Sequence, residues 1–266
     1  MGGAGETMLD AIATPIWQLS QSHLNQLIEC PRQFQYRYLE QWGLPTVALQ
    51  PEQQILGSQF HHLLQQRSLG LNIRPFLGVN EQLRQWFETL DQSPPPLIAG
   101  DSLSEHQQLL SWGDFTLVAV YDRLIQNPQQ AQILDWKTYT RPRNLERLRQ
   151  SWQTRLYPYI LVENSSYAPE QVAMVYWFAQ TRPGESHTLV LPYDTSQHQQ
   201  THQDLTQMLA QLSKGLVAYG NGQNLEQTAI STGRCDRCPF FTRCRGGREQ
   251  PETDVMELDD IAEIPI

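Results

Sequence analysis

The stretch FTLVAVYDRLIQNPQQAQILDWKT, residues 115–138, decides the fold of this chain. Within it, two apolar runs, residues 115–124 and 132–137, are separated by the turn-forming pair Asn127-Pro128. Runs of this length bounded by turn residues are typical of β-strands. The stretch therefore predicts two antiparallel strands that are neighbours in a sheet.

The flanking sequence extends this pair into an α/β domain. EHQQLLSW, residues 105–112, precedes it across the turn Gly113-Asp114 and completes a three-stranded meander. The order of helix, meander, helix and strand predicts the α/β class, with a sheet covered by helices. The other predicted elements are two short helices within 20–41 broken at Pro31, helices at about 51–66, 79–91, 144–162 and 196–218, and strands at 172–179 and 188–192.

The meander carries two carboxylates at strand ends, Asp122 in YDRL and Asp135 in ILDWKT. Antiparallel neighbours joined by a turn can bring both side chains within reach of one metal ion. Asp135 and Lys137 are two residues apart, so they project from the same face of the strand. Two carboxylates form a hard oxygen site for Mg²⁺ or Mn²⁺, and a neighbouring lysine can hold or help to deprotonate an attacking water.

Three further residue types bear on this site. His61 lies on a predicted helix that can pack against the sheet, but His62 follows it, so the residue types leave the choice of ligand open. Gln153 and Tyr157 are four residues apart on the next helix and share one face. They either face the site or form a hydrogen bond to each other on an amphipathic helix.

All four cysteines fall into one pattern, with Cys30 alone near the N-terminus and Cys235, Cys238 and Cys244 forming C-x2-C-x5-C. A chain of this size without a secretory signal does not need a disulfide framework. Four thiolates suit a cubane iron–sulfur cluster or a tetrahedral zinc ion. The alternative is that Cys30 is an unrelated buried thiol and the triplet binds nothing.

The composition predicts a soluble, cytoplasmic protein. The chain has 266 residues, no apolar run long enough to span a bilayer, and no secretory signal at its N-terminus. We expect one domain at 18–244, a disordered N-terminal segment at 1–17, and an acidic, disordered tail at 245–266.

The net charge of −9 argues at first against a nucleic-acid partner. The charge is uneven, however, because the tail at 245–266 holds two arginines and seven acidic residues. Arg141, Arg143 and Arg147 form a basic cluster that can contact phosphates or, equally, can be an ordinary solvated helix face.

Taken in order, these motifs resemble the RecB-like branch of the PD-(D/E)XK nuclease superfamily, in the iron–sulfur form found in CRISPR-associated RecB-like nucleases and the AddB nuclease domain. The resemblance covers most of the chain and implies a restriction-endonuclease-like core: a mixed central sheet flanked by helices, with the N- and C-terminal segments joined by a metal cluster. It is carried by SQSHLNQLIECPRQFQYRYL at 20–39, G-x3-H at Gly57 to His61, YDRL, LDWKT, Q-x3-Y at Gln153 to Tyr157, and the cysteine triplet. One departure is Ala119, where the family commonly has glycine.

The resemblance also implies a role for each motif residue. The ligands of Mg²⁺ or Mn²⁺ would be His61 rather than His62, Asp122, Asp135 and the backbone carbonyl of Trp136. Lys137 would position the nucleophilic water, and Gln153 and Tyr157 would orient the lysine or the DNA backbone. Cys30, Cys235, Cys238 and Cys244 would hold a 4Fe-4S cluster, with zinc as the alternative.

The function implied is a metal-dependent DNA nuclease that leaves a 5′-phosphate, an exonuclease acting on single strands or free ends. DNA repair, recombination or CRISPR adaptation would be its setting. The sequence has no Walker A motif, so a helicase or CRISPR-adaptation partner would be a separate chain. The alternative from another class is a cluster-stapled DNA-binding or helicase-partner adaptor with weak catalysis.

Overall fold

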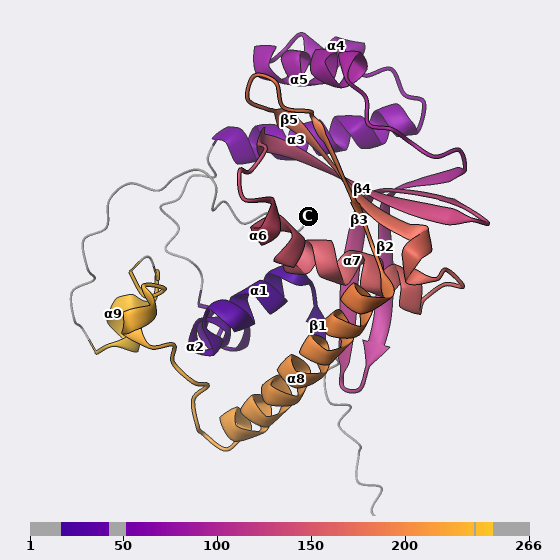
Figure 1. Ribbon diagram of the computed structural model, residues 1–266. Helices are drawn as coiled ribbons and strands as arrows, with labels where there is room; N and C mark the ends of the chain where they lie inside the picture. Colours follow the sequence, from indigo (N-terminus) through magenta and orange to yellow (C-terminus); the bar gives the residue numbers. More distant parts are fainter. Residues whose placement is uncertain (1–16, 43–51, 237, 247–266) are drawn as a thin grey trace, which may run out of the picture.

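The computed structural model describes residues 17–42, 52–236 and 238–246. The predicted N-terminal segment at 1–16 and residues 247–266 of the acidic tail lie outside them. Figure 1 shows one sheet with helices on both of its faces. The fold is α/β with a mixed central sheet, as predicted.

The sheet has six strands in the order β1-β3-β4-β5-β6, with β2 paired to β3. The β1–β3 and β4–β5 pairs are parallel and the remaining pairs are antiparallel, so the sheet is mixed. The predicted meander is confirmed as β2, β3 and β4. The bounds are β1 (Trp17–Leu19), β2 (Asp101–Trp112), β3 (Phe115–Asn127), β4 (Gln130–Thr140), β5 (Val172–Gln180) and β6 (Thr188–Pro192).

Strand β1 is not predicted from the sequence. Trp17 was expected in the unstructured N-terminal segment, whereas in the structure it begins β1 and pairs with Phe115. A strand of three residues has too few positions for alternation to be recognised. Only its parallel pairing with β3 defines it.

Helices surround the sheet and largely match the predicted ranges. The predicted helix at 144–162 is in fact two helices, because Ser151 adopts an extended backbone and its side chain accepts the N–H of Thr154 as an N-cap. The helices are α1 (Gln21–Glu29), α2 (Pro31–Phe34), the π-helical turn η1 (Gln35–Leu39), α3 (Glu52–Ser68), α4 (Arg74–Leu77), α5 (Glu81–Gln92), α6 (Leu145–Gln150), α7 (Trp152–Glu163), η2 (Pro169–Gln171), α8 (Thr195–Gly220), η3 (Ile230–Thr232) and α9 (Phe241–Cys244).

Each face of the sheet has its own hydrophobic core. Helices α1, α7 and α8 cover the face that includes Tyr176, and α3 and α5 cover the face that includes Trp177. Neighbouring residues of β5 thus point into different cores, which explains why its sequence is apolar without alternation. Burying a large apolar side chain contributes about 1.5–3 kcal/mol, so β5 anchors both layers.

The sheet opens into a fork beside β3. The β3–β4 ladder runs from Asn127–Gln130 to Arg123–Leu134 and ends there, one step before Asp122 and Asp135 would face each other. Farther along β3, the neighbour is β1 instead. The two carboxylates therefore lie where the strands separate, in a gap that side chains of the covering helices can enter.

Candidate active site

A buried triangle of polar groups lies on the β4 side of the fork. Lys137 Nζ is 2.7 Å from Asp135 Oδ2, and these side chains are only 2% and 4% exposed. Gln153, in the first turn of α7, donates from Nε2 to Asp135 Oδ1 at 2.6 Å and accepts from Lys137 Nζ at 3.0 Å. A buried charge requires a partner of this kind. Asp135 and Gln153 thus fix the position of the lysine ammonium.

Asp122 occupies the other side of the fork. Its Oδ2 accepts the backbone N–H of Trp136 at 2.7 Å, and its Oδ1 lies 3.3 Å from His61 Nδ1. This hydrogen bond links β3 to β4 at the point where the regular ladder has ended. The carbonyl of Trp136 remains a predicted metal ligand.

His61 reaches Asp122 because α3 packs closely on the sheet. A Cβ at Gly57 would lie 3.1 Å from Thr138 Oγ1, so glycine permits this approach of the helix to β4. His61 lies one helical turn farther along, at the fork. His62 is exposed and its Nε2 is 2.9 Å from Gln66 Nε2. The position in the fold thus separates two histidines between which the residue types alone left the choice open.

Tyr157 completes the α7 side of the site. It is buried and hydrogen-bonded to Gln153, which also contacts Asp135. The two side chains therefore face the site and also form a hydrogen bond to each other. Burial raises the pKa of the Tyr157 hydroxyl, and the carboxylates of Asp135 and Asp122 raise it further. Tyr157 is therefore a neutral hydroxyl at physiological pH.

Glu105 is a residue of the site that the sequence argument missed. It lies on β2, and one ligand atom from each of His61, Glu105 and Asp122 lies within 4.8 Å of the others. Asp135 is not a member of this group among the described residues. The signal was present in the hairpin, because pairing Trp112 with Phe115 across the turn sets Glu105 opposite Asp122.

The two facing carboxylates titrate differently. Burial and then the charge of Asp122 raise the pKa of Glu105, against a smaller lowering by His61. Burial also acts to raise the pKa of Asp122, but His61, the Trp136 N–H and Lys137 together outweigh it and lower that pKa. Asp122 is therefore the better stabilised anion of the pair.

The three arginines of the predicted basic cluster differ in their surroundings. Arg141 donates to the carbonyl of Ser186 at 2.7 Å, so its guanidinium joins β4 to the β5–β6 connection. Arg143 precedes α6 and Arg147 lies on it, and both side chains are exposed. Their contact with nucleic acid remains a prediction.

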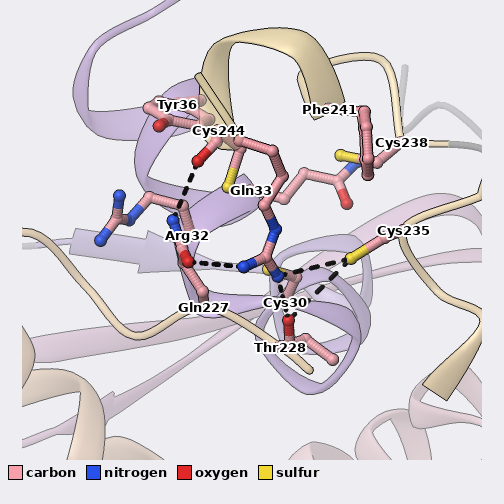
Figure 2. A pocket seen from close by; sticks show the side chains of 11 residues that line it. Cys30, Arg32, Gln33, Tyr36, Gln227, Thr228, Cys235, Cys238, Phe241 and Cys244 are labelled. Atoms are coloured by element: carbon pink, nitrogen blue, oxygen red, sulfur yellow. Dashed lines mark hydrogen bonds between the residues drawn. The ribbon is translucent and has the colours of Figure 1, made fainter. Parts of the chain in front are cut away.

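The four cysteines line one pocket, although Cys30 lies some 200 residues from the other three along the chain. Cys30 stands between α1 and α2, Cys235 and Cys238 lie in a turn, and Cys244 ends α9. Figure 2 shows these four side chains around the same space, and none of them forms a disulfide. The donor set and its convergence fit a four-cysteine metal group.

Polar groups around this pocket differ in their effect on the thiols. Burial acts to raise the pKa of Cys30, but hydrogen bonds from the backbone and hydroxyl of Thr228 and from the backbones of Gln33 and Arg32 outweigh it and lower the pKa. Burial raises the pKa of Cys238 and of Cys244. Of Cys30, Cys238 and Cys244, Cys30 is thus closest to the thiolate form that binds metal.

One guanidinium supports this fit. Arg245 donates to the carbonyl of Thr228 at 2.7 Å and approaches Cys235 Sγ at 3.8 Å. Its Nε is buried and has no hydrogen-bond partner among the described residues. A sulfur-ligated anionic group in the pocket would offer this N–H an acceptor.

Hydrogen bonds also join the two chain segments that carry the cysteines. Gln35 is fully buried, donates to Asn224 Oδ1 at 2.6 Å and accepts the N–H of Leu225 at 2.7 Å. Arg32 Nε donates to the carbonyl of Leu225 at 2.7 Å. Direct hydrogen bonds therefore join the α2–η1 segment to the segment after α8.

Comparison with known proteins now identifies the class. A profile of the PD-(D/E)XK nuclease superfamily matches residues 18–245, so this chain belongs to that superfamily of nucleases. A candidate exonuclease from Eubacterium rectale is 11% identical with a TM-score of 0.53, over 99% of this chain and 100% of that chain. The protein SSO0001 is 16% identical with a TM-score of 0.45, over 87% of each chain.

At such identities a structural likeness concerns the fold alone. None of the curated proteins compared with the chain matches it. In the described part of the chain, each helix is too short or too polar for a bilayer span.

Proposed function

We propose that this protein is a divalent-cation-dependent DNA nuclease that hydrolyses phosphodiester bonds and leaves 5′-phosphates. The observation that carries the proposal is the buried Lys137–Asp135–Gln153 triangle next to the Asp122–His61 pair at the fork of the sheet. Membership of a nuclease superfamily supports it. We further propose exonuclease action on single strands or free ends.

His61, Asp122, Asp135 and the carbonyl of Trp136 would hold Mg²⁺ or Mn²⁺. Carboxylate oxygens together with one imidazole suit these hard cations. When bound, the cation would lower the pKa of a water and neutralise charge on the phosphate.

Lys137 supplies a fixed positive charge for the phosphate undergoing attack. Its Nζ is oriented by Asp135 and Gln153 before substrate arrives, so no reorganisation is needed during the reaction. Gln153 holds both members of the ion pair at once, and the Tyr157 hydroxyl in turn holds Gln153. These two residues would orient the lysine or the DNA backbone.

The cysteine pocket would hold a 4Fe-4S cluster, with Zn²⁺ as the alternative, which would place the chain in the RecB-like iron–sulfur branch. The convergence of all four sulfurs on one pocket supports this. The cluster would have a structural role within one nuclease domain spanning 18–244. A helicase or a CRISPR-adaptation protein on a separate chain, in DNA repair, recombination or adaptation, is the proposed setting.

Cleavage of end-labelled single-stranded and duplex DNA tests the function. Wild-type protein, purified without oxygen, should cut with Mg²⁺ or Mn²⁺ and not with EDTA. Lys137→Ala should lower the rate by about a thousandfold, since preorganised charge at a reacting phosphate acts on that scale. Lys214→Ala removes the only other lysine, which is exposed on α8, and should cut normally.

Asp122→Asn is a second variant that keeps the shape of the side chain, and it should also lose cutting while remaining folded. Wild-type protein that is folded and binds DNA, yet cuts no substrate with either metal, would refute the nuclease proposal in favour of the adaptor.

A further inference from the structure

Strand β2 has a local distortion directly opposite Asp122. The flanking pairs Ser104–Arg123 and His106–Tyr121 keep one register, but Glu105 and Asp122 between them do not pair. Glu105 has φ +49°, in the left-handed region that non-glycine residues rarely adopt. Such a conformation persists where the surroundings enforce it, and it often accompanies a functional role.

The side chain at this distortion makes no hydrogen bond or ion pair with the described residues. Across residues 17–42, 52–236 and 238–246, the Glu105 carboxylate forms no hydrogen bond or ion pair. It is half-buried and faces the carboxylate of Asp122. Two like charges placed together on a partly buried surface are unfavourable unless a cation lies between them.

The geometry supplies a place for that cation. His61 comes from α3, Glu105 from β2 and Asp122 from β3, and one donor atom of each lies within 4.8 Å of the others. Two carboxylates and an imidazole are a donor set for a hard divalent cation. Asp135, in contrast, has its carboxylate engaged by Lys137 and Gln153.

We propose that Glu105 is a ligand of the active-site Mg²⁺ or Mn²⁺, acting together with His61 and Asp122. This rests on the proposed cation dependence and extends its ligand set to β2. The left-handed backbone at Glu105 turns the carboxylate toward Asp122, and the bound cation offsets both the strain and the repulsion. Asp135, a proposed ligand from β4, also holds Lys137.

Mn²⁺ titration without DNA tests the proposal, by calorimetry and by the electron paramagnetic resonance of unbound Mn²⁺. Glu105→Gln should weaken Mn²⁺ binding by at least about tenfold, the scale on which partners of a metal site contribute. Asp101→Asn removes an exposed charge from the same strand and should bind Mn²⁺ as wild type does.

Thermal unfolding separates a ligand from a structural residue. Without metal, Glu105→Gln and Glu105→Gly should unfold at or above the wild-type temperature, because the first removes repulsion and the second also removes strain. Both should show a smaller stabilisation by Mn²⁺. A purely structural glutamate would instead lower the unfolding temperature without metal.

The outcomes distinguish this proposal from the nuclease function. Wild-type and Glu105→Gln proteins that bind Mn²⁺ equally would overturn the role of Glu105 and leave the nuclease proposal in place. Failure of the wild type to bind Mn²⁺ at all would overturn both the ligand proposal and cation dependence.

Discussion

The two sites of this molecule are built in opposite ways. The candidate active site lies at a fork in the sheet, and its ionic groups are fixed by buried partners from β3, β4 and α7. The cysteine site lies between two chain segments of short helices and turns, and its four side chains are only partly buried. Metal would therefore add chemistry to the first site, whereas it would add structure to the second.

The difference lies in what surrounds each set of ligands. Lys137 projects from a strand that is covered on both faces by continuous hydrophobic cores. The two segments that carry the cysteines are joined instead by a few hydrogen bonds, including those of Gln35. We expect loss of metal to leave the first site in place and to loosen the second.

The largest effect is expected from breaking the buried ion pair. Lys137→Met should destabilise the protein by about 3–5 kcal/mol, because Asp135 is left as a buried charge without its cation. Urea unfolding monitored by tryptophan fluorescence measures this loss.

The double variant Lys137→Met, Asp135→Asn is the matched control. It should regain most of the lost stability, since no buried charge remains, yet stay inactive. If the single variant is as stable as wild type, the fork is not the rigid site described above.

Removal of a cysteine should have a smaller and more local effect. Cys238→Ser should lose the metal and destabilise the protein by about 2–4 kcal/mol, below the roughly 5 kcal/mol idealised for closing a loop of this length. Hydrogen exchange should rise in segments 28–36 and 224–245 but stay unchanged in β4 and β5. A rise throughout the sheet would contradict the local role.

Gln35→Ala provides the comparison for the cysteine variant. It leaves the buried N–H of Leu225 without its acceptor, which costs about 1–3 kcal/mol. With metal bound, exchange near Leu225 should rise less than in Cys238→Ser protein. Equal increases would mean that hydrogen bonds, and not the cluster, hold the junction.

The smallest effect concerns pH and the helix that precedes Cys30. Burial lowers the pKa of His23, as does the charge of Arg37, and His23 Nδ1 accepts the N–H of Ser20. The folded-state pKa of His23 lies below the unfolded value of 6.5. The contribution of neutral His23 to the free energy of unfolding is therefore full above pH 6.5 and is lost as the pH falls from 6.5 through the folded-state pKa.

Urea unfolding at pH 7.5 and 5.5 checks this contribution. His23→Asn should show a weaker loss of stability toward pH 5.5 than wild type, whereas His62→Asn, at an exposed position, should behave like wild type. If both variants show the wild-type pH dependence, the titration of His23 does not cause the loss of stability toward pH 5.5.

Much of the site could be predicted because its signals are local. The pattern of β3 and β4 placed Asp122, Asp135 and Lys137 on neighbouring strands, and the structure has them at the fork. Glu105 was missed because a single glutamate in a strand is unremarkable until the hairpin register is fixed. Ser151 was missed as a cap because the apolar spacing continues through it.

The sequence by itself determined the strand and helix types, the α/β class and the residues able to perform the chemistry, because these follow from local periodicity and side-chain type. Tertiary structure alone decided that β3 changes partners at Asp122 and how His61 and Cys30, both expected from the family resemblance, come to lie beside Asp122 and Cys235. These outcomes depend on how distant segments pack. Periodicity specifies which face of an element is buried, but it does not specify what that face will meet.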